Sequence, residues 1–180
     1  MKQYCPACGC EQEIRLLQKD ETYKVKEARI SIKATVCTCA VCGEEIMSIE
    51  YDDQNLRNAY AQYRELHGLL QPHEIKAIRD TYGVSQVTFA RILGVGDKTI
   101  ARYENGSLQD EAINNLILLA ADPKNLRRLL EKNEELISAD EAQRLKAKLG
   151  EVRVFAVWEK TPKGYTYNLD PEDDLYRYVG

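Results

Sequence analysis

Cysteines in two pairs of identical spacing form the most chemically specific pattern in the sequence. Cys5 and Cys8 enclose two residues, as do Cys39 and Cys42, and a glycine follows each pair directly. Four thiolates at this spacing fit the tetrahedral coordination of a structural zinc site, and such a shell leaves no open position for a catalytic water. We therefore predict one structural Zn²⁺ per chain, bound by Cys5, Cys8, Cys39 and Cys42.

The glycine after each pair distinguishes the ligands from the other two cysteines. A zinc knuckle folds backbone N–H groups toward sulfur, which is easiest where there is no side chain. Cys10 and Cys37 lie between the two pairs, each two residues from the nearer pair, and are not followed by glycine. We therefore expect small, semi-buried thiols there, with redox sensing as the alternative. The pairs also resemble those of rubredoxin, an iron electron carrier, but the segment lacks the aromatic richness of that family.

Composition sets the broad class of the protein. The chain has 180 residues, of which 44% are hydrophobic and 30% charged, as expected for a soluble protein of one or two domains. No segment approaches the roughly 20 apolar residues that a membrane span requires, and the N-terminus lacks the apolar core of a signal peptide. We therefore expect a cytoplasmic protein. In that reducing compartment the six cysteines are expected to act as metal ligands more readily than as disulfides.

A second pattern, between Gln86 and Asn105, meets the positional restrictions of a helix-turn-helix. Ala90 places a small residue where the second helix crosses the first, and Gly94 allows the turn to take positive φ. The apolar residues that would join the two helices are Phe89, Leu93, Val95, Ile100 and Tyr103. The exposed face of the second helix carries polar side chains that can reach base edges and phosphates from the major groove. The pattern predicts DNA binding.

The formal net charge of −4 does not exclude this function. Phosphate contacts depend on local charge, and between Leu69 and Gly106 basic side chains slightly outnumber acidic ones. Acidic residues concentrate in the tail from Asp170 to Asp174, which would repel DNA and could attract a basic partner protein.

The surrounding segments predict an α+β fold. Residues 1–50 form a zinc ribbon, in which Ile30, Ile32, Ala34 and Val36 alternate with polar residues as in a half-buried strand, paired with a strand near Tyr23 to Lys26. Residues 51–68 form a connector helix between domains. The face of this helix is predicted to comprise Leu56, Tyr60, Tyr63 and His67.

The remaining segments predict an all-α domain followed by an extension. Residues 69–121 hold a helix that starts at Pro72 and ends at Gly83, the helix-turn-helix, and a further helix from Ser107. Residues 122–150 form a helical extension, broken where Ser138 and Glu141 resemble a capping box. Residues 151–180 form a β-hairpin, which includes Trp158 and turns before Gly164, and the acidic tail. We expect Trp158 and the tyrosines of this hairpin to pack in a core. The alternatives are edge-to-edge pairing across a dimer and binding of a partner.

A CxxCG ribbon, a short connector and then a helix-turn-helix, in this order, resemble the MqsA-type antitoxins, whose ribbon is called the YgiT-type zinc finger. The resemblance covers about residues 1–121 and places Cys5, Cys8, Cys39 and Cys42 on the ligand positions of the family. The second half resembles the larger Cro/CI-like (XRE) class. The resemblance implies a homodimeric, non-enzymatic transcriptional repressor that binds an inverted-repeat operator in its own promoter and a toxin, commonly an RNA-cleaving enzyme.

Two other classes of function are alternatives to this one. A phage or chromosomal transcription regulator without a toxin would use the extension for sensing or dimerisation. An enzyme is disfavoured because His67 and His73 do not lie beside a nucleophile motif and the sequence has no phosphate-binding glycine loop.

The resemblance also implies roles for single residues. Arg102 stands where the family has a base-reading arginine. Lys98 stands where the protein after which the family is named has a base-reading asparagine. Gln86 takes a position that often contacts a phosphate in the Cro/CI-like class, and Arg79 with Glu104 matches a buried ion pair of that class. Asp97 is expected to cap the second helix or to lie in its first turn. The predicted DNA-binding residues are Gln86, Asp97, Lys98, Thr99 and Arg102.

Overall fold

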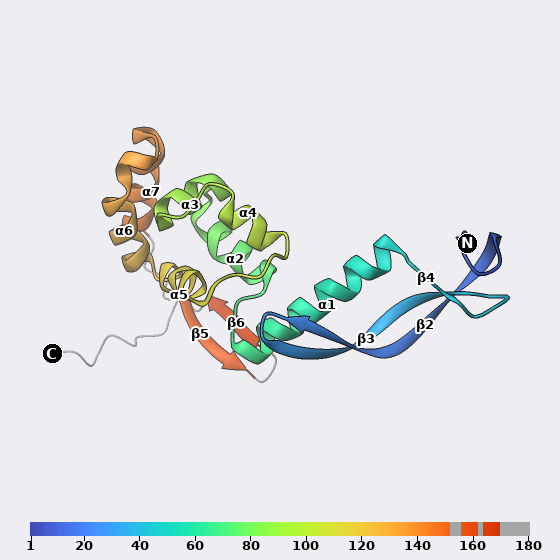
Figure 1. Cartoon of the computed structure of the whole chain (residues 1–180). Coiled ribbons are helices and arrows are strands. Elements are labelled where there is room, and N and C mark those ends of the chain that lie inside the picture. The colour runs from blue at the N-terminus through green and yellow to red at the C-terminus, as the bar shows by residue number, and fades with distance from the viewer. Residues whose placement is uncertain (152–155, 162–163, 170–180) are drawn as a thin grey trace. The chain divides into compact units, whose positions relative to one another are not determined.

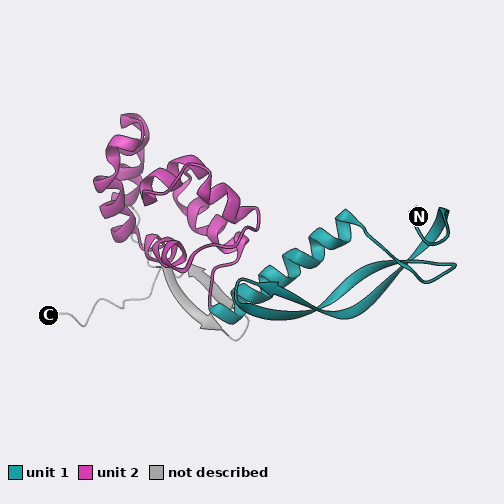
Figure 2. Cartoon of the chain, in the orientation of Figure 1, with its two compact units in different colours: residues 1–67 teal, residues 68–180 magenta. Residues whose placement is uncertain are grey.

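The computed structural model describes the backbone of residues 1–151, 156–161 and 164–169, shown in Figure 1. The chain forms two compact units, Met1–His67 and Gly68–Gly180 (Figure 2). An antiparallel sheet with one helix makes up the first unit, and the second is helical up to its terminal hairpin. The predicted α+β class is confirmed.

The first unit is built on a long β-hairpin. Its four strands, in the order β1-β2-β3-β4, are Lys2–Cys5, Cys10–Val25, Ala28–Cys39 and Glu45–Ile46. The predicted alternation in β3 is confirmed, because Ile30, Ile32, Ala34 and Val36 are buried. The partner strand β2 is much longer than expected: it pairs with β3 from Ile14 opposite Cys39 to Val25 opposite Ala28.

Helix α1 (Ile49–His67) packs against β3 and β2 in the same unit. Its predicted face is wrong by one position: Tyr63 is buried as expected, but Leu56 is 38% exposed. The reason is Asn55, which is buried and bonds through its amide to the backbone N–H and C=O of Thr35, at 2.9 and 2.8 Å. Asn55 therefore turns toward the sheet, and its neighbour Leu56 turns outward.

The second unit contains six α-helices and one 3₁₀ turn among the residues that are described through position 151. The α-helices are α2 (Pro72–Tyr82), α3 (Gln86–Leu93), α4 (Thr99–Glu104), α5 (Glu111–Ala120), α6 (Pro123–Lys132) and α7 (Ala139–Glu151), and the 3₁₀ turn is η1 (Glu134–Leu136). The predicted bounds of α2 are confirmed, with Gly83 at φ +66°. The predicted start of α5 at Ser107 is wrong, because the side chain of Gln109 is fully buried and donates to the carbonyl of Leu70.

The helical extension belongs to the core of the second unit. Leu126 and Leu130 of α6 and Leu145 of α7 are buried in one cluster with Phe89. The amide of Asn133 donates to the carbonyl of Ile92 at 2.8 Å and ties the end of α6 to α3. The helical extension therefore packs within this unit.

The predicted break in the extension is also confirmed. The hydroxyl of Ser138 accepts a hydrogen bond from the backbone N–H of Glu141 at 3.3 Å, just where α7 begins. None of the described helices is long and apolar enough to cross a membrane.

A terminal hairpin pairs β5 (Ala156–Thr161) with β6 (Gly164–Leu169) in antiparallel register, with Trp158 opposite Tyr167. The predicted hairpin is confirmed for these backbone segments. Three predictions lie outside the described residues: the start of the hairpin at Val152, the packing of its side chains, and the acidic tail from Asp170 to Asp174.

Candidate metal centre and nucleic-acid interface

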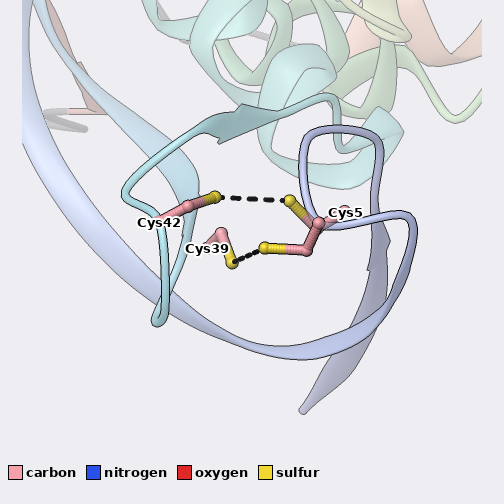
Figure 3. A group of neighbouring side chains, drawn as sticks. Cys5, Cys39 and Cys42 are labelled. Carbon is pink, nitrogen blue, oxygen red and sulfur yellow. Dashed lines mark hydrogen bonds between the residues drawn. The ribbon is translucent and has the colours of Figure 1, made fainter.

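Two turns at the end of the long hairpin bring four sulfur atoms together (Figure 3). The sulfurs of Cys5, Cys8, Cys39 and Cys42 all lie within 4.8 Å of one another. The Cys5–Cys42 distance is 3.5 Å and the Cys8–Cys39 distance is 3.9 Å. A tetrahedral ion with Zn–S bonds of about 2.3 Å separates its sulfurs by about 3.8 Å. The four cysteines therefore form a site for one metal ion, consistent with structural zinc, as the sequence predicts.

The glycine after each pair is required by backbone conformation. Gly9 and Gly43 have φ of +69° and +77°, and each donates its N–H to the carbonyl of the first cysteine of its pair at 2.9 Å. Open space surrounds the position of a Cβ at both glycines, so positive φ and not crowding favours glycine. The N–H of Val41 points to the sulfur of Cys39 at 3.4 Å, as expected for a knuckle.

The thiols of the cluster differ in acidity. Backbone N–H groups of Cys42 and then Val41 lower the pKa of Cys39 to about 6, whereas hydrogen bonding with the Cys42 side chain is the largest cause that raises the pKa of Cys8. Four neighbouring thiolates repel one another, and a bound divalent cation offsets that repulsion. The donor set is therefore suited to a cation that remains bound.

The two other cysteines lie outside the four-sulfur cluster, as expected. Cys37 is buried beside Cys39 and Ile46 in a small core. Cys10 is exposed and accepts a hydrogen bond from the amide of Gln12 at 3.2 Å. The expectation of a semi-buried thiol is therefore wrong for Cys10.

Helices α3 and α4 have the predicted turn between them. The hydroxyl of Ser85 accepts from the backbone N–H of Thr88 at 3.0 Å and caps the start of α3. Ala90 is fully buried at the crossing of the two helices, and Gly94 ends α3 at φ +71°. The predicted apolar contacts are confirmed, since Phe89, Leu93, Ile100 and Tyr103 are buried and Val95 packs against the same core.

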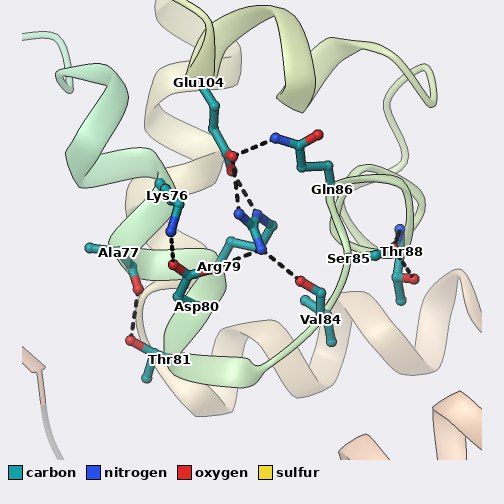
Figure 4. A network of polar contacts seen from close by, with 10 residues as sticks. All are labelled: Lys76, Ala77, Arg79, Asp80, Thr81, Val84, Ser85, Gln86, Thr88 and Glu104. Carbon is teal, nitrogen blue, oxygen red and sulfur yellow. Dashed lines mark hydrogen bonds and ion pairs between the residues drawn. The ribbon is translucent and has the colours of Figure 1, made fainter.

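An ion pair ties α2 to the end of α4 (Figure 4). Arg79 donates from Nε and Nη2 to the two carboxylate oxygens of Glu104, at 2.7 and 3.0 Å, and the side chains are only 11% and 5% exposed. Hydrogen bonding to Glu104 raises the pKa of Arg79. The third guanidinium nitrogen donates to the carbonyl of Val84 at 2.9 Å. The predicted buried pair is confirmed.

Two of the predicted DNA-binding cations lie on an open surface. Lys98 precedes α4 and Arg102 lies four residues later, so the two are close to the same face of the helix, and both are exposed. Thr99 is half-buried at the first position of α4. The side-chain amide of Gln86 donates to the carboxylate of Glu104 at 2.6 Å, so one of its hydrogen-bond donors is used within the protein.

Asp97 neither caps α4 nor lies in its first turn. The helix begins at Thr99, and the carboxylate of Asp97 accepts from Nε and Nη2 of Arg91 at 3.0 and 2.8 Å. This bidentate contact with the end of α3 explains the difference. Arg91 was not among the predicted site residues, although a cation six residues before Asp97 at the helix-turn junction was a detectable signal.

Comparison with known families gives a match over most of the chain. Residues 1–139 match the model described as the antitoxin component of bacterial toxin-antitoxin system, MqsA. This match extends past the resemblance at residues 1–121 and includes α6 and η1. A comparison with curated proteins finds no match.

Proposed function

The chain belongs to the MqsA antitoxin family, and on that premise we propose that it is a cytoplasmic DNA-binding protein that represses its own operon. In this proposal a homodimer binds an inverted-repeat operator, and the same chain binds a toxin. The α3–α4 pair acts as a helix-turn-helix, with α4 in the major groove.

The open face of α4 is the observation that carries the DNA-binding proposal. The opposite side of α4 is fixed in the core by Ile100 and Tyr103, and its last residue is held by Arg79. Lys98 and Arg102 remain exposed on a short, rigid element. An arginine in this position can donate two hydrogen bonds to guanine O6 and N7. Such rigid support favours base reading, because a loosely held side chain discriminates poorly.

The operator sequence is proposed to differ from those of relatives that carry asparagine at the position of Lys98. Asparagine pairs best with adenine, whereas lysine binds guanine or phosphate. Arg102 would keep the family contact. In this proposal the chain shares its binding mode with those relatives. It differs from them in the base that it prefers next to the Arg102 contact.

The metal centre has a structural role in this proposal. The core around Cys5, Cys37, Cys39 and Ile46 is small, so metal ligation supplies stability that apolar burial does not. When bound, zinc cross-links the two knuckles. We assign no catalytic step to the chain, because four thiolates fill a tetrahedral shell.

Binding to the DNA upstream of its own gene tests the proposal directly. Fluorescence anisotropy should give tighter binding to that duplex than to a scrambled duplex of equal length. Equal affinity for the two would contradict sequence-specific repression. Purification of the chain with the product of its neighbouring gene tests the toxin separately: a stable complex supports the antitoxin role, and a neighbour that never associates favours a regulator without a toxin.

A further inference from the structure

A cavity of about 290 Å³ lies between the α2–α3 turn and α7 in the second unit. One wall is the segment from Tyr82 to Ser85, which leads into α3. The other wall is α7, which contributes Glu141, Arg144, Leu145 and Lys148. Helix α7 begins at Ala139, where the family match ends. The cavity is therefore completed by residues outside the matched part of the family.

Two cations of α7 line this cavity one helical turn apart. The Nζ of Lys148 lies 3.2 Å from the point that a Cβ of Gly83 would occupy, so the ammonium group lies over the turn. In the part of the chain whose side chains are described, Lys148 has no acidic partner. Arg144 pairs with Asp140 at 2.5 Å, but both side chains are well exposed, at 77% and 68%. A guanidinium has five N–H donors, so it can bind a second anion while it keeps this pair.

Glu141, the acidic residue of the lining, already accepts hydrogen bonds from within the protein. Glu141 accepts from the hydroxyls of Thr88 and Ser138, at 3.0 and 2.9 Å. These bonds hold its carboxylate against the start of α3 and lower its pKa, chiefly through Ser138. Arg144 and Lys148 are the cationic side chains of the lining, and both can donate to an added anion.

We propose that this cavity binds a phosphate group through Arg144 and Lys148, and that on the operator the group belongs to the DNA backbone. The DNA source rests on the proposed function: in a helix-turn-helix the first helix crosses the backbone, and the cavity lies at Ser85, where α3 begins. The α7 contact would add affinity without sequence information, since phosphates carry none. The alternative ligand with the same chemistry is a free phosphate ion.

Removal of both cations tests the DNA source. Arg144→Ala/Lys148→Ala should weaken binding to the operator duplex and to a scrambled duplex alike, by roughly three- to thirtyfold. The slope of log affinity against log salt should become shallower by about 2. The matched control is Arg128→Ala/Lys132→Ala, two exposed cations with the same spacing on α6, which should change neither quantity. The charge-keeping variant Arg144→Lys/Lys148→Arg should retain most of the slope.

A titration of the DNA-free protein with inorganic phosphate tests the other source. The readout is the NMR shifts of Gly83 and Ser85, which would saturate with phosphate in the wild type and vanish in the Arg144→Ala/Lys148→Ala variant. If these shifts occur while that variant binds DNA as the wild type does, the cavity is assigned to a free phosphate and the DNA source is overturned. Unchanged DNA binding together with no phosphate shifts would overturn the whole proposal. If the wild type binds no DNA at all, the proposed function fails, and the phosphate titration still decides whether the cavity is an anion site.

Discussion

Arg79 and Glu104 form a bidentate ion pair that joins α2 to the last residue of α4, with both side chains almost fully buried. The pair also bonds to the carbonyl of Val84 and the amide of Gln86. One interaction therefore fixes the end of α4 and the segment before α3. The orientation of the exposed cations on α4 depends on it.

Removal of one member of this pair should destabilise the second unit. Glu104→Ala leaves the Arg79 guanidinium with only the half-exposed carboxylate of Asp80, at 2.8 Å. Breaking a buried ion pair costs about 3–5 kcal/mol, and we expect the low end of that range here. Urea unfolding followed by circular dichroism measures the loss. The control is Glu131→Ala, because Glu131 pairs with Arg127 at an exposed site and should cost less than about 1 kcal/mol. Equal stabilities for the two variants would show that the pair is not structural.

Asn55 should be essential to the first unit. Asn55→Ala removes both hydrogen bonds to Thr35 and leaves the edge of β3 open, at a cost of about 1–3 kcal/mol. The control Asn58→Ala changes an exposed residue of the same helix and should have little effect on thermal unfolding. If Asn55→Ala and Asn58→Ala unfold at the same temperature, the contact between Asn55 and Thr35 does not position α1.

The metal centre predicts one zinc per chain in freshly purified, reduced protein. Cys39→Ser removes a ligand, so the bound metal should be lost, as measured by elemental analysis. Cys10→Ser changes an exposed thiol outside the cluster and should keep the zinc. Stoichiometric iron in the wild type, or retention of zinc by Cys39→Ser, would contradict the assignment.

Lys98→Asn should change which operator is preferred with little change in fold. Lys98 is exposed, and asparagine favours adenine where lysine favours guanine or phosphate. A binding selection from randomised duplexes should show a shift toward adenine at one position in each half-site. Identical selected sequences for the variant and the wild type would remove Lys98 from the base-reading set.

Local patterns were sufficient for the parts of the molecule that are set by short-range rules. Cys5 and Cys39 were identified from the spacing of each pair and the glycine that follows it, since a knuckle is formed within a few residues. The start of α2 at Pro72 and the end of α3 at Gly94 follow from backbone conformation, so they too could be predicted.

Features that depend on tertiary partners could not be predicted in the same way. Asn55 is polar and suggests an exposed position, but its amide satisfies a strand edge that only the fold brings near. Asp97 bonds to Arg91 across the turn, and Gln86 bonds to Glu104 from another helix. The helical extension was predicted from the sequence, but the packing of Leu126 and Leu130 against Phe89 was not.

Operator binding by Arg102→Ala tests the central claim most directly. The duplex is the DNA upstream of the gene, and Arg128→Ala, an exposed arginine on α6, is the control. We predict that Arg102→Ala loses about 1–3 kcal/mol of binding free energy on the operator and discriminates less well between base pairs at that position. The control should bind as the wild type does. An affinity and base preference that are unchanged in Arg102→Ala would contradict the account.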